Sequence, residues 1–376
     1  MPPCKPTNCL EDNEMKITLD KIETSNSRND NNNSGNNNNI NITNKRISKE
    51  DISTIDSCIK ILKEHCPKIL NIFEIKELIG SGSESKVYKV IYKNTNKEFA
   101  MKLISLENKE KPNMIELSIS NKFKHKNIIM FYGFYEIKKN ELECIVMEYA
   151  KFGNLRDFQK NVLKRNEISE QLLCYLAFHI LNGLNYCHKC KVTHFDIKPQ
   201  NIIINEFLEV KLIDFSVSVN YSLIKSKKIK LPFRGTNFYM APEVIKSKTV
   251  NVKDLNKIDL YSFGVILYSL AFGNYPYGLN SEDSKDYDKI YYKIQNNKLE
   301  FKNDDNYFSK YFIDFLEKLL EKDINKRINI NQALNHYWIK GGNILNDEKE
   351  KTFNTANFLI NLITDHYMNF DNYIKN

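Results

Sequence analysis

The sequence has no apolar run long enough to cross a membrane. Its longest apolar stretches, such as residues 261–272, are too short for a spanning helix and contain Ser and Gly. Residues 1–5 form no apolar signal core, and position 2 carries no glycine for myristoylation. We therefore expect an intracellular protein without a transmembrane segment, located in the cytoplasm, with the nucleus as the alternative.

The sequence also lacks the cysteine pattern of a disulfide framework or a zinc finger. Eight cysteines in 376 residues are too few for a disulfide scaffold in an intracellular chain. Cys187 and Cys190 form a CxxC, but no second Cys or His pair has finger spacing. We interpret this CxxC as structural, with half of a zinc site as the alternative. The formal charge of +8 accompanies Lys, Asn and Ile throughout the chain, so we expect no nucleic-acid partner.

No GKS or GKT of a P-loop is present, although the sequence has a glycine turn. Gly80 and Gly82 lie between predicted strands at residues 73–79 and 86–91. Without a Cβ, glycine lets backbone N–H groups approach phosphate oxygens closely. Because strands flank the turn on both sides, the pattern argues against a dinucleotide fold, which needs a strand and then a helix.

The N-terminal region divides into two predicted segments. Residues 1–48 are polar with an Asn-rich run, bury too little apolar surface to fold, and are predicted to be disordered. Residues 49–70 are predicted to form an amphipathic helix with Ser48 as N-cap, Asp51 completing a capping box and Pro67 ending or bending the helix. Its apolar face comprises Ile52, Ile55, Ile59, Leu62, Cys66 and Ile69. We expect it to dock on the main domain, with a regulatory or dimerisation role as the alternative.

The main domain begins with further strands and then becomes helical. Strands are predicted at residues 99–103, 128–134 and 143–149, and a long helix at 170–187. Lys102 lies inside an apolar strand, where a charge is costly unless it is paired. Glu116, in a helix predicted to end near residue 125, is its candidate partner.

The richest chemistry lies in residues 194–201, His-Phe-Asp-Ile-Lys-Pro-Gln-Asn. Asp196, Lys198 and Asn201 bring an acid, a cation and an amide together, and a second acid, Asp214, follows downstream. These groups can hold metal-bound phosphate beside a hydroxyl group.

In this order the motifs resemble a eukaryotic Ser/Thr protein kinase over residues 73–338. The resemblance also rests on Gly-Thr-Asn-Phe-Tyr-Met-Ala-Pro-Glu at residues 235–243, on a central helix starting near Asp259, and on Arg327 as the partner of Glu243. It implies an α+β, two-lobed kinase fold with ATP bound between the lobes. The N-lobe, residues 71–149, would be an antiparallel sheet with one main helix, and the C-lobe, residues 150–340, mainly helical. Residues 341–376 are predicted to form a linker and a short amphipathic helix.

The resemblance assigns roles to individual residues. Asp196 would orient the substrate hydroxyl and accept its proton, and Lys198 would neutralise the moving phosphoryl group. Asn201 and Asp214 would hold Mg²⁺, with Mn²⁺ as the alternative. The remaining catalytic residues are Lys102, paired with Glu116, and Thr236. The other ATP contacts are assigned to Ile79, Gly80, Ser81, Gly82, Val87, Ala100, Met147, Glu148, Ala150, Asn154 and Ile203.

The implied function is transfer of the γ-phosphoryl group of Mg-ATP to Ser or Thr hydroxyls of protein substrates. Lys198 and Thr236 favour this class over tyrosine kinases. The alternative is a pseudokinase, or a weakly active kinase acting as a scaffold or allosteric partner, because Ser85 replaces the third loop glycine and Glu84 lies at the loop tip.

Other departures concern regulation and substrate choice. Phe195 replaces the usual Arg, so we expect activity without a phosphate read at this position; Ser222 and Ser226 are candidate phosphosites. Ser216 replaces a glycine and should disfavour a flip of Asp214, while Ser120 should loosen the helix of Glu116. A solvated basic loop, or one that attracts acidic or prephosphorylated substrates, is formed by Lys225, Lys227, Lys228, Lys230 and Arg234. The sequence leaves the oligomeric state open.

Overall fold

The computed structural model describes residues 48–82, 84–106, 123–138, 141–161, 168–233, 235–301 and 307–341. The chain divides into two compact units, and one division between them lies between Tyr149 and Ala150. Residues 124–128 belong to the second unit. The predicted disordered segment up to residue 47, the helix containing Glu116 and Ser120, and the C-terminal helix lie outside the described residues.

The first unit is built on a five-stranded antiparallel sheet, here called the sheet unit. Its strands are β1 (Phe73–Ser81), β2 (Ser85–Tyr92), β3 (Lys97–Ser105), β4 (Phe131–Lys138) and β5 (Leu142–Glu148), in the order β1-β2-β3-β5-β4. All five predicted strands are confirmed, but the one expected at 128–134 begins at Phe131. Ile128 instead forms an isolated parallel bridge with Leu212 of the second unit.

The strands alternate side chains between the two faces of the sheet, because the side-chain period of a strand is two. One face contributes the aromatic and aliphatic core, including Tyr88, Met101 and Cys144. The residues between them, such as Val87, Lys102 and Ile145, point to the opposite face by register. The two faces thus have different roles, one packed by the N-terminal helices and one carrying the predicted nucleotide contacts.

The predicted helix at residues 49–70 is two helices, α2 (Ile55–His65) and α3 (Pro67–Ile72). The start at Ser48 was wrong. Ser48 and Asp51 do exchange hydrogen bonds, but Thr54 is the N-cap, in a capping box with Ser57. Pro67 opens α3, where its missing N–H leaves no helical bond unmade.

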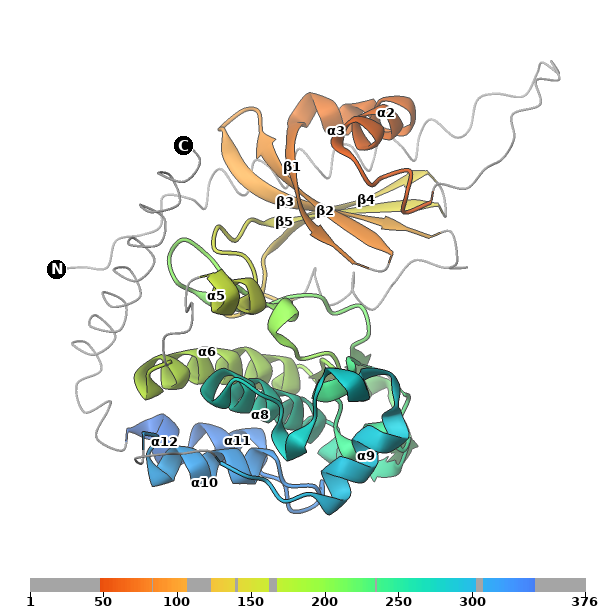
Figure 1. Cartoon of the computed structure of the whole chain (residues 1–376). Coiled ribbons are helices and arrows are strands. Elements are labelled where there is room, and N and C mark those ends of the chain that lie inside the picture. Colours follow the sequence, from red (N-terminus) through yellow and green to blue (C-terminus); the bar gives the residue numbers. More distant parts are fainter. Residues whose placement is uncertain are drawn as a thin grey trace. The chain divides into compact units, whose positions relative to one another are not determined.

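The apolar face itself is confirmed, because its members pack into one core with the sheet. The Tyr88 hydroxyl donates to the Ile52 carbonyl at 2.6 Å and ties the segment to β2. Figure 1 shows α2 and α3 against one face of the sheet.

The second unit, here called the helical unit, contains α5 (Leu155–Asn161), α6 (Glu170–Lys189), α7 (Pro242–Ile245), α8 (Lys257–Phe272), α9 (Tyr287–Asn296), α10 (Lys310–Leu319), α11 (Ile330–Leu334) and α12 (Tyr337–Lys340). Most of α8 is buried, as expected of a central helix (Figure 1). Three strand pairs position the loops: β6 (Val192–Thr193) with β9 (Val219–Asn220), β7 (Ile202–Ile204) with β8 (Val210–Leu212), and β10 (Lys228–Lys230) with β11 (Thr249–Asn251). Among the described residues, no helix combines the length and apolar character needed to cross a membrane.

Candidate active site

The loop from His194 to Lys198 is anchored by hydrogen bonds to one buried carboxylate. This is the carboxylate of Asp259, in the first turn of α8. Asp259 accepts the backbone N–H groups of His194 and Phe195, each at 2.9 Å. It also lies 2.8 Å from Nε2 of His188, which is in the last turn of α6. Because Asp259 is fully buried, these partners replace its lost hydration and fix the loop backbone.

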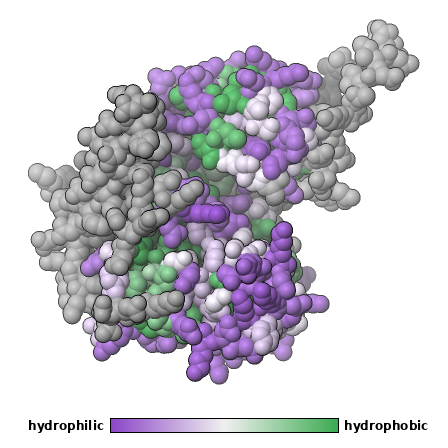
Figure 2. Space-filling view, in the orientation of Figure 1, coloured by the Kyte–Doolittle hydropathy of each residue, from purple (hydrophilic) through white to green (hydrophobic). Residues whose placement is uncertain are grey.

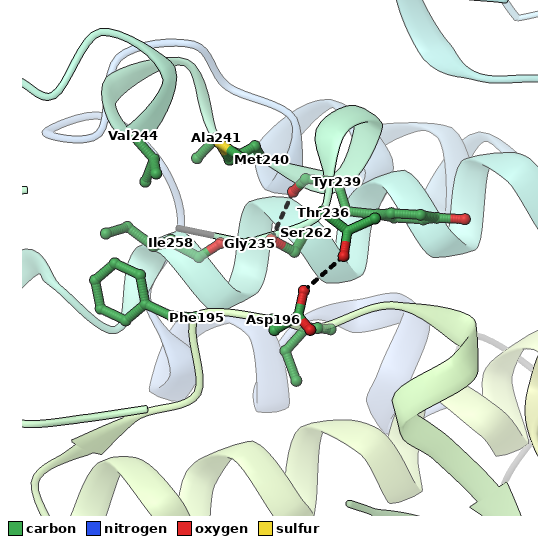
Figure 3. A pocket seen from close by; sticks show the side chains of 11 residues that line it. Phe195, Asp196, Gly235, Thr236, Tyr239, Met240, Ala241, Val244, Ile258 and Ser262 are labelled. Atoms are coloured by element: carbon green, nitrogen blue, oxygen red, sulfur yellow. Dashed lines mark hydrogen bonds between the residues drawn. The ribbon is translucent and has the colours of Figure 1, made fainter. Parts of the chain in front are cut away.

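Four polar side chains converge at the end of this loop. The Asp196 carboxylate accepts the Thr236 hydroxyl at 2.8 Å and the Asn201 amide at 3.0 Å, and pairs with Lys198 at 2.7 Å. Lys198 also donates to the Thr236 hydroxyl at 2.9 Å. Thr236 arrives from a segment forty residues away in sequence, and Figure 3 shows its side chain and that of Asp196 pointing toward each other. The result is a carboxylate held in place by a cation, an amide and a hydroxyl.

Asp214 is placed beside this group by the backbone. The Ile213 N–H donates to the Asn201 carbonyl at 3.0 Å, and His194 Nε2 lies 3.0 Å from the Ile213 carbonyl. Asp214 itself adopts a left-handed backbone with φ of 64°. Phe215, fully buried, packs against His194 with ring centroids 4.9 Å apart and the ring planes tilted by 48°. Asn201 and Asp214 thus come from adjoining segments, and both offer the oxygen ligands that Mg²⁺ and Mn²⁺ prefer.

Phe195 turns its side chain away from Asp196. Its backbone is left-handed, with φ of 68°, and its ring is 4% exposed. The ring faces Val244 and Ile258, whereas Asp196 faces Thr236 (Figure 3). The carbonyl of Phe195 lies where a Cβ on Gly235 would come within 2.9 Å, so that glycine permits a close backbone approach. Phe195 is therefore part of an apolar contact beneath the segment that carries Thr236.

The segment ends in a buried ion pair between Glu243 and Arg327, the pairing expected from the sequence. Arg327 donates to both carboxylate oxygens of Glu243, at 2.7 and 3.0 Å. It also donates to two backbone carbonyls, and its guanidinium lies 4.8 Å from the centre of the Tyr261 ring. The bidentate pair fixes α7 to the connection between α10 and α11, and the bond from Arg327 to the Lys257 carbonyl ties that connection to the start of α8.

In the sheet unit, the predicted nucleotide contacts lie on one face. Val87 pairs with Lys102 across β2 and β3, and Ala100 pairs with Met147 across β3 and β5. Directly opposite residues in neighbouring strands point to the same side. Val87, Ala100, Lys102 and Met147 therefore lie on the face opposite α2 and α3.

The glycine turn is closed by its own contacts. The Gly82 N–H donates to the Ser85 carbonyl at 2.9 Å, and Lys86 donates to the Ser81 hydroxyl at 2.8 Å. Gly80 pairs with Val87 in the sheet, and Ile79 is 42% exposed. Ser85, which stands at the position of the third loop glycine, is therefore the first residue of β2.

The predicted contacts near the end of β5 have backbone partners. The Glu148 N–H donates to the Met130 carbonyl at 2.9 Å. In the helical unit, the Gly153 N–H donates to the Ala150 carbonyl at 3.1 Å. Asn154 caps α5 by accepting the Arg156 and Asp157 N–H groups, a structural task that the sequence did not suggest.

Other predicted residues are placed only in part. Asn154 forms an isolated antiparallel bridge with Ile203, which is 8% exposed. Glu116 and Arg234 lie outside the described residues, so the proposed Lys102–Glu116 pair stays a prediction.

Sequence reasoning missed the roles of Asp259 and His188. Asp259 was noted only as the start of a helix, and His188 only as part of the CxxC. The available signal was a lone acid in a helix that is otherwise apolar on every side, since such a charge must be paired when buried. Burial raises the pKa of the Cys187 thiol well above its usual value, and Asp259 raises it further, which opposes a thiolate ligand there. Cys190, by contrast, is exposed.

The comparisons with known proteins agree with this arrangement. The family model of the protein kinase domain matches residues 73–339. The chain belongs to the protein kinase family.

Several relatives carry kinase names. The chain is 32% identical over 283 residues to MAP kinase kinase MKK1/SSP32 of Saccharomyces cerevisiae, covering 73% of this chain and 54% of that protein. It is 33% identical over 271 residues to serine/threonine-protein kinase dst1 of Dictyostelium discoideum, covering 72% of this chain and 35% of that protein. It is 30% identical over 251 residues to serine/threonine-protein kinase CLA4 of Candida albicans, covering 65% of this chain and 25% of that protein. The chain thus spans about half, or less, of the length of these relatives.

Proposed function

We propose that this chain is a protein kinase that transfers the γ-phosphoryl group of ATP to Ser or Thr hydroxyls of protein substrates. The observation that carries this proposal is the group formed by Asp196, Lys198, Asn201 and Thr236. A carboxylate held by a cation and an amide can receive the proton of an attacking hydroxyl. The family and the names of the relatives support the same reaction.

The Thr236 hydroxyl occupies one Asp196 oxygen at 2.8 Å, the distance at which a substrate hydroxyl would have to bind. In the reaction, the substrate hydroxyl donates to Asp196 while Lys198 bridges toward the transferred group. Phosphoryl transfer passes through a loose transition state, so positioning and charge neutralisation supply most of its acceleration.

ATP and a divalent cation are the cofactors of this proposal. Asn201 and Asp214 would hold the ion, for which Mg²⁺ is the first choice and Mn²⁺ the second; the ion neutralises charge on the phosphates when bound. Lys102 would contact the α- and β-phosphates. The adenine ring would lie against Val87, Ala100 and Ile203.

Phosphorylation measured with labelled ATP tests the proposal. The full chain should phosphorylate itself or a degenerate Ser/Thr peptide mixture, and Asp196→Asn should reduce this by at least about a hundredfold, the lower range of general-base catalysis. Lys310→Ala, an exposed change on α10, serves as the matched control. Equal signal from the wild-type chain and Asp196→Asn would overturn the enzyme assignment. It would favour the scaffold alternative.

We also propose that activity does not require residue 195 to bind a phosphate group on a phosphorylated serine. A buried phenyl ring cannot donate to a phosphate, and the ring instead lines an apolar region together with Val244 and Ile258. Replacing Ser222 and Ser226 together with Ala should therefore leave peptide phosphorylation within about twofold of wild type. Loss of activity with unchanged folding would contradict this.

The cytoplasm is our proposed site of action, following from the sequence alone. Substrates there would be cellular proteins with exposed Ser or Thr residues.

A further inference from the structure

The segment between the two acids Asp214 and Glu243 carries charge of one sign. Residues 215–242 contain four lysines and one arginine and no Asp or Glu. A protein surface usually mixes both signs, because like charges on one element repel. The structure shows what this segment builds.

Residues 228–230 form β10 and pair with β11, which follows Glu243 in sequence. Lys228 pairs with Asn251 and Lys230 with Thr249, so the two lysines point to one side of the ribbon and Ile229 to the other. The Lys248 carbonyl accepts the Leu231 N–H and the Lys227 carbonyl accepts the Val252 N–H, both at 3.0 Å.

The pairing gathers lysines from two stretches of sequence onto one ribbon. We call the lysine patch the six exposed residues Lys225, Lys227, Lys228, Lys230, Lys248 and Lys253.

The lysine patch is not neutralised within the described part of the chain, where none of its six ammonium groups forms an ion pair. Neighbouring lysines behave differently. Lys246 pairs with Asp288 at 2.6 Å, and Lys289 and Lys293 pair with Asp283 at 2.9 and 2.6 Å. Among the described residues, carboxylates therefore pair with lysines around the patch and with none of its six members. Hydrophilic residues cover this side of the helical unit, near α9, in Figure 2.

A short segment of chain connects the patch to Thr236, the residue that contacts the predicted base Asp196. Five residues separate Lys230 from Thr236, whose hydroxyl donates to Asp196. Within that connection Leu231 is buried, and just beyond it the Tyr287 hydroxyl donates to Asn237 at 2.6 Å. An anion bound to the patch would consequently be held by the same segment that borders the reacting hydroxyl.

We propose that the lysine patch binds the acidic or phosphorylated flank of a peptide substrate and thereby selects substrates. This inference rests on the proposed kinase function. A peptide fits better than a nucleic acid, because the ribbon presents no aromatic ring for base stacking. The Tyr291 ring is already covered by two lysines, with Lys246 4.7 Å and Lys248 of the patch 5.8 Å from its centre.

Two measurements test the proposal, one of them independent of catalysis. The first uses the full chain and a degenerate Ser peptide library in which each flanking position is fixed in turn as Glu, phosphoserine, Ala or Lys. The second uses fluorescence anisotropy to measure how fluorescent peptides from that library bind to the Asp196→Asn protein. The protein is treated with phosphatase, and the phosphatase is removed, before the peptides are added. Both are repeated with Lys228→Ala/Lys230→Ala and with the charge-preserving Lys228→Arg/Lys230→Arg.

The matched control is Lys310→Ala/Lys340→Ala, which removes two exposed charges from α10 and α12. We expect the Glu or phosphoserine peptide to bind Asp196→Asn most tightly of the peptides. Adding the Ala double substitution should weaken that binding about three- to tenfold, the effect of losing two exposed ion pairs. Added salt should shrink this difference by screening it. The Arg double variant and the control should keep the preference.

The outcomes distinguish failure of the peptide-binding inference from failure of the proposed kinase function. Active enzyme without preference for Glu or phosphoserine overturns the inference and leaves the kinase assignment standing. A preference that survives the Ala double variant also overturns it. If the wild-type chain phosphorylates nothing but acidic peptides still bind through the patch, the proposed kinase function is refuted and the binding site stands. Patch-dependent binding to phosphatidylserine vesicles or to single-stranded RNA, with no peptide preference, would overturn the peptide assignment.

Discussion

Replacing Phe195 should reveal two opposing contributions to the free energy of unfolding. Burial of the ring stabilises the fold, and the left-handed backbone destabilises it. Phe195 is 4% exposed, and its ring lines an apolar region together with Val244 and Ile258. Its backbone, with φ of 68°, lies in the left-handed region, which costs a non-glycine residue roughly 1–2 kcal/mol. Removing the ring and relieving the backbone can therefore be separated with two substitutions.

Phe195→Ala removes the ring and keeps the strained backbone, so it should lower the free energy of unfolding by about 3–5 kcal/mol, the range for buried Phe to Ala. Phe195→Gly also removes the ring but relieves roughly 1–2 kcal/mol of strain. The greater entropy of glycine in the unfolded chain offsets about 0.4–1 kcal/mol of that relief. We therefore expect the Gly variant to be more stable than the Ala variant by about 0.5–1 kcal/mol.

Gly273 allows the reverse substitution at a nearly identical φ. Its φ is 70°, and an added Cβ would meet nothing within 4 Å, so Gly273→Ala measures the left-handed penalty less the same unfolded-chain entropy term, without a steric clash. Gly273→Ala should lose about as much stability as Phe195→Gly gains over Phe195→Ala. Agreement in size and opposition in sign would show that backbone conformation explains the difference.

The assay is urea unfolding of the full chain followed by tryptophan fluorescence. The chain has a single tryptophan, Trp338, which is 2% exposed in α12 and so reports on the helical unit. If the Ala variant proved more stable than the Gly variant, the left-handed strain at Phe195 would be refuted. Equal unfolding of wild type and both variants would refute the buried apolar role of the ring.

Three further predictions concern other parts of the chain. Leu62→Ala should destabilise the sheet unit by about 2–5 kcal/mol and increase hydrogen exchange in β1, whereas the exposed Lys63→Ala should change stability by less than about 0.5 kcal/mol. Burial lowers the pKa of His179 to about 4; because the unfolded chain binds this proton near pH 6.5, lowering the pH from 7 to 5 should remove about 2 kcal/mol of stability. Titrating Trp338 fluorescence would check this, and His179→Gln should flatten the dependence. Asp259→Asn should destabilise the helical unit by about 3 kcal/mol or more in the same assay, since an amide nitrogen would face N–H donors; stability within 1 kcal/mol of wild type would contradict this.

The sequence predicted elements whose cause is local and failed where the cause lies elsewhere in the fold. The strands carry alternating apolar residues, and α6 carries a helical repeat, so both were found within a few residues. The helix start at Ser48 was wrong because Ser48 and Asp51 form the hydrogen bonds of a cap without a helix after them. Sequence can show that a cap is chemically available, but packing decides where the chain turns helical.

The loop from His194 to Asn201 follows the same rule. The residue types of Asp196, Lys198 and Asn201 were readable from spacing, because their chemistry is fixed by the side chain. The contact of Thr236 with Asp196 was not, because it joins segments forty residues apart. The positive φ of Phe195 was also hidden, since nothing in a phenylalanine favours a left-handed backbone.

Asp259 explains how such a strained residue is tolerated. Its carboxylate accepts the N–H groups of both His194 and Phe195, and each charge-assisted bond contributes more than a neutral one. Two such bonds, of about 1.5–3 kcal/mol each, exceed the roughly 1–2 kcal/mol of left-handed strain at Phe195. The buried acid of α8 therefore holds the loop in a conformation that its own sequence would not choose. That conformation turns the Phe195 ring toward the apolar contact and leaves Asp196 facing Thr236.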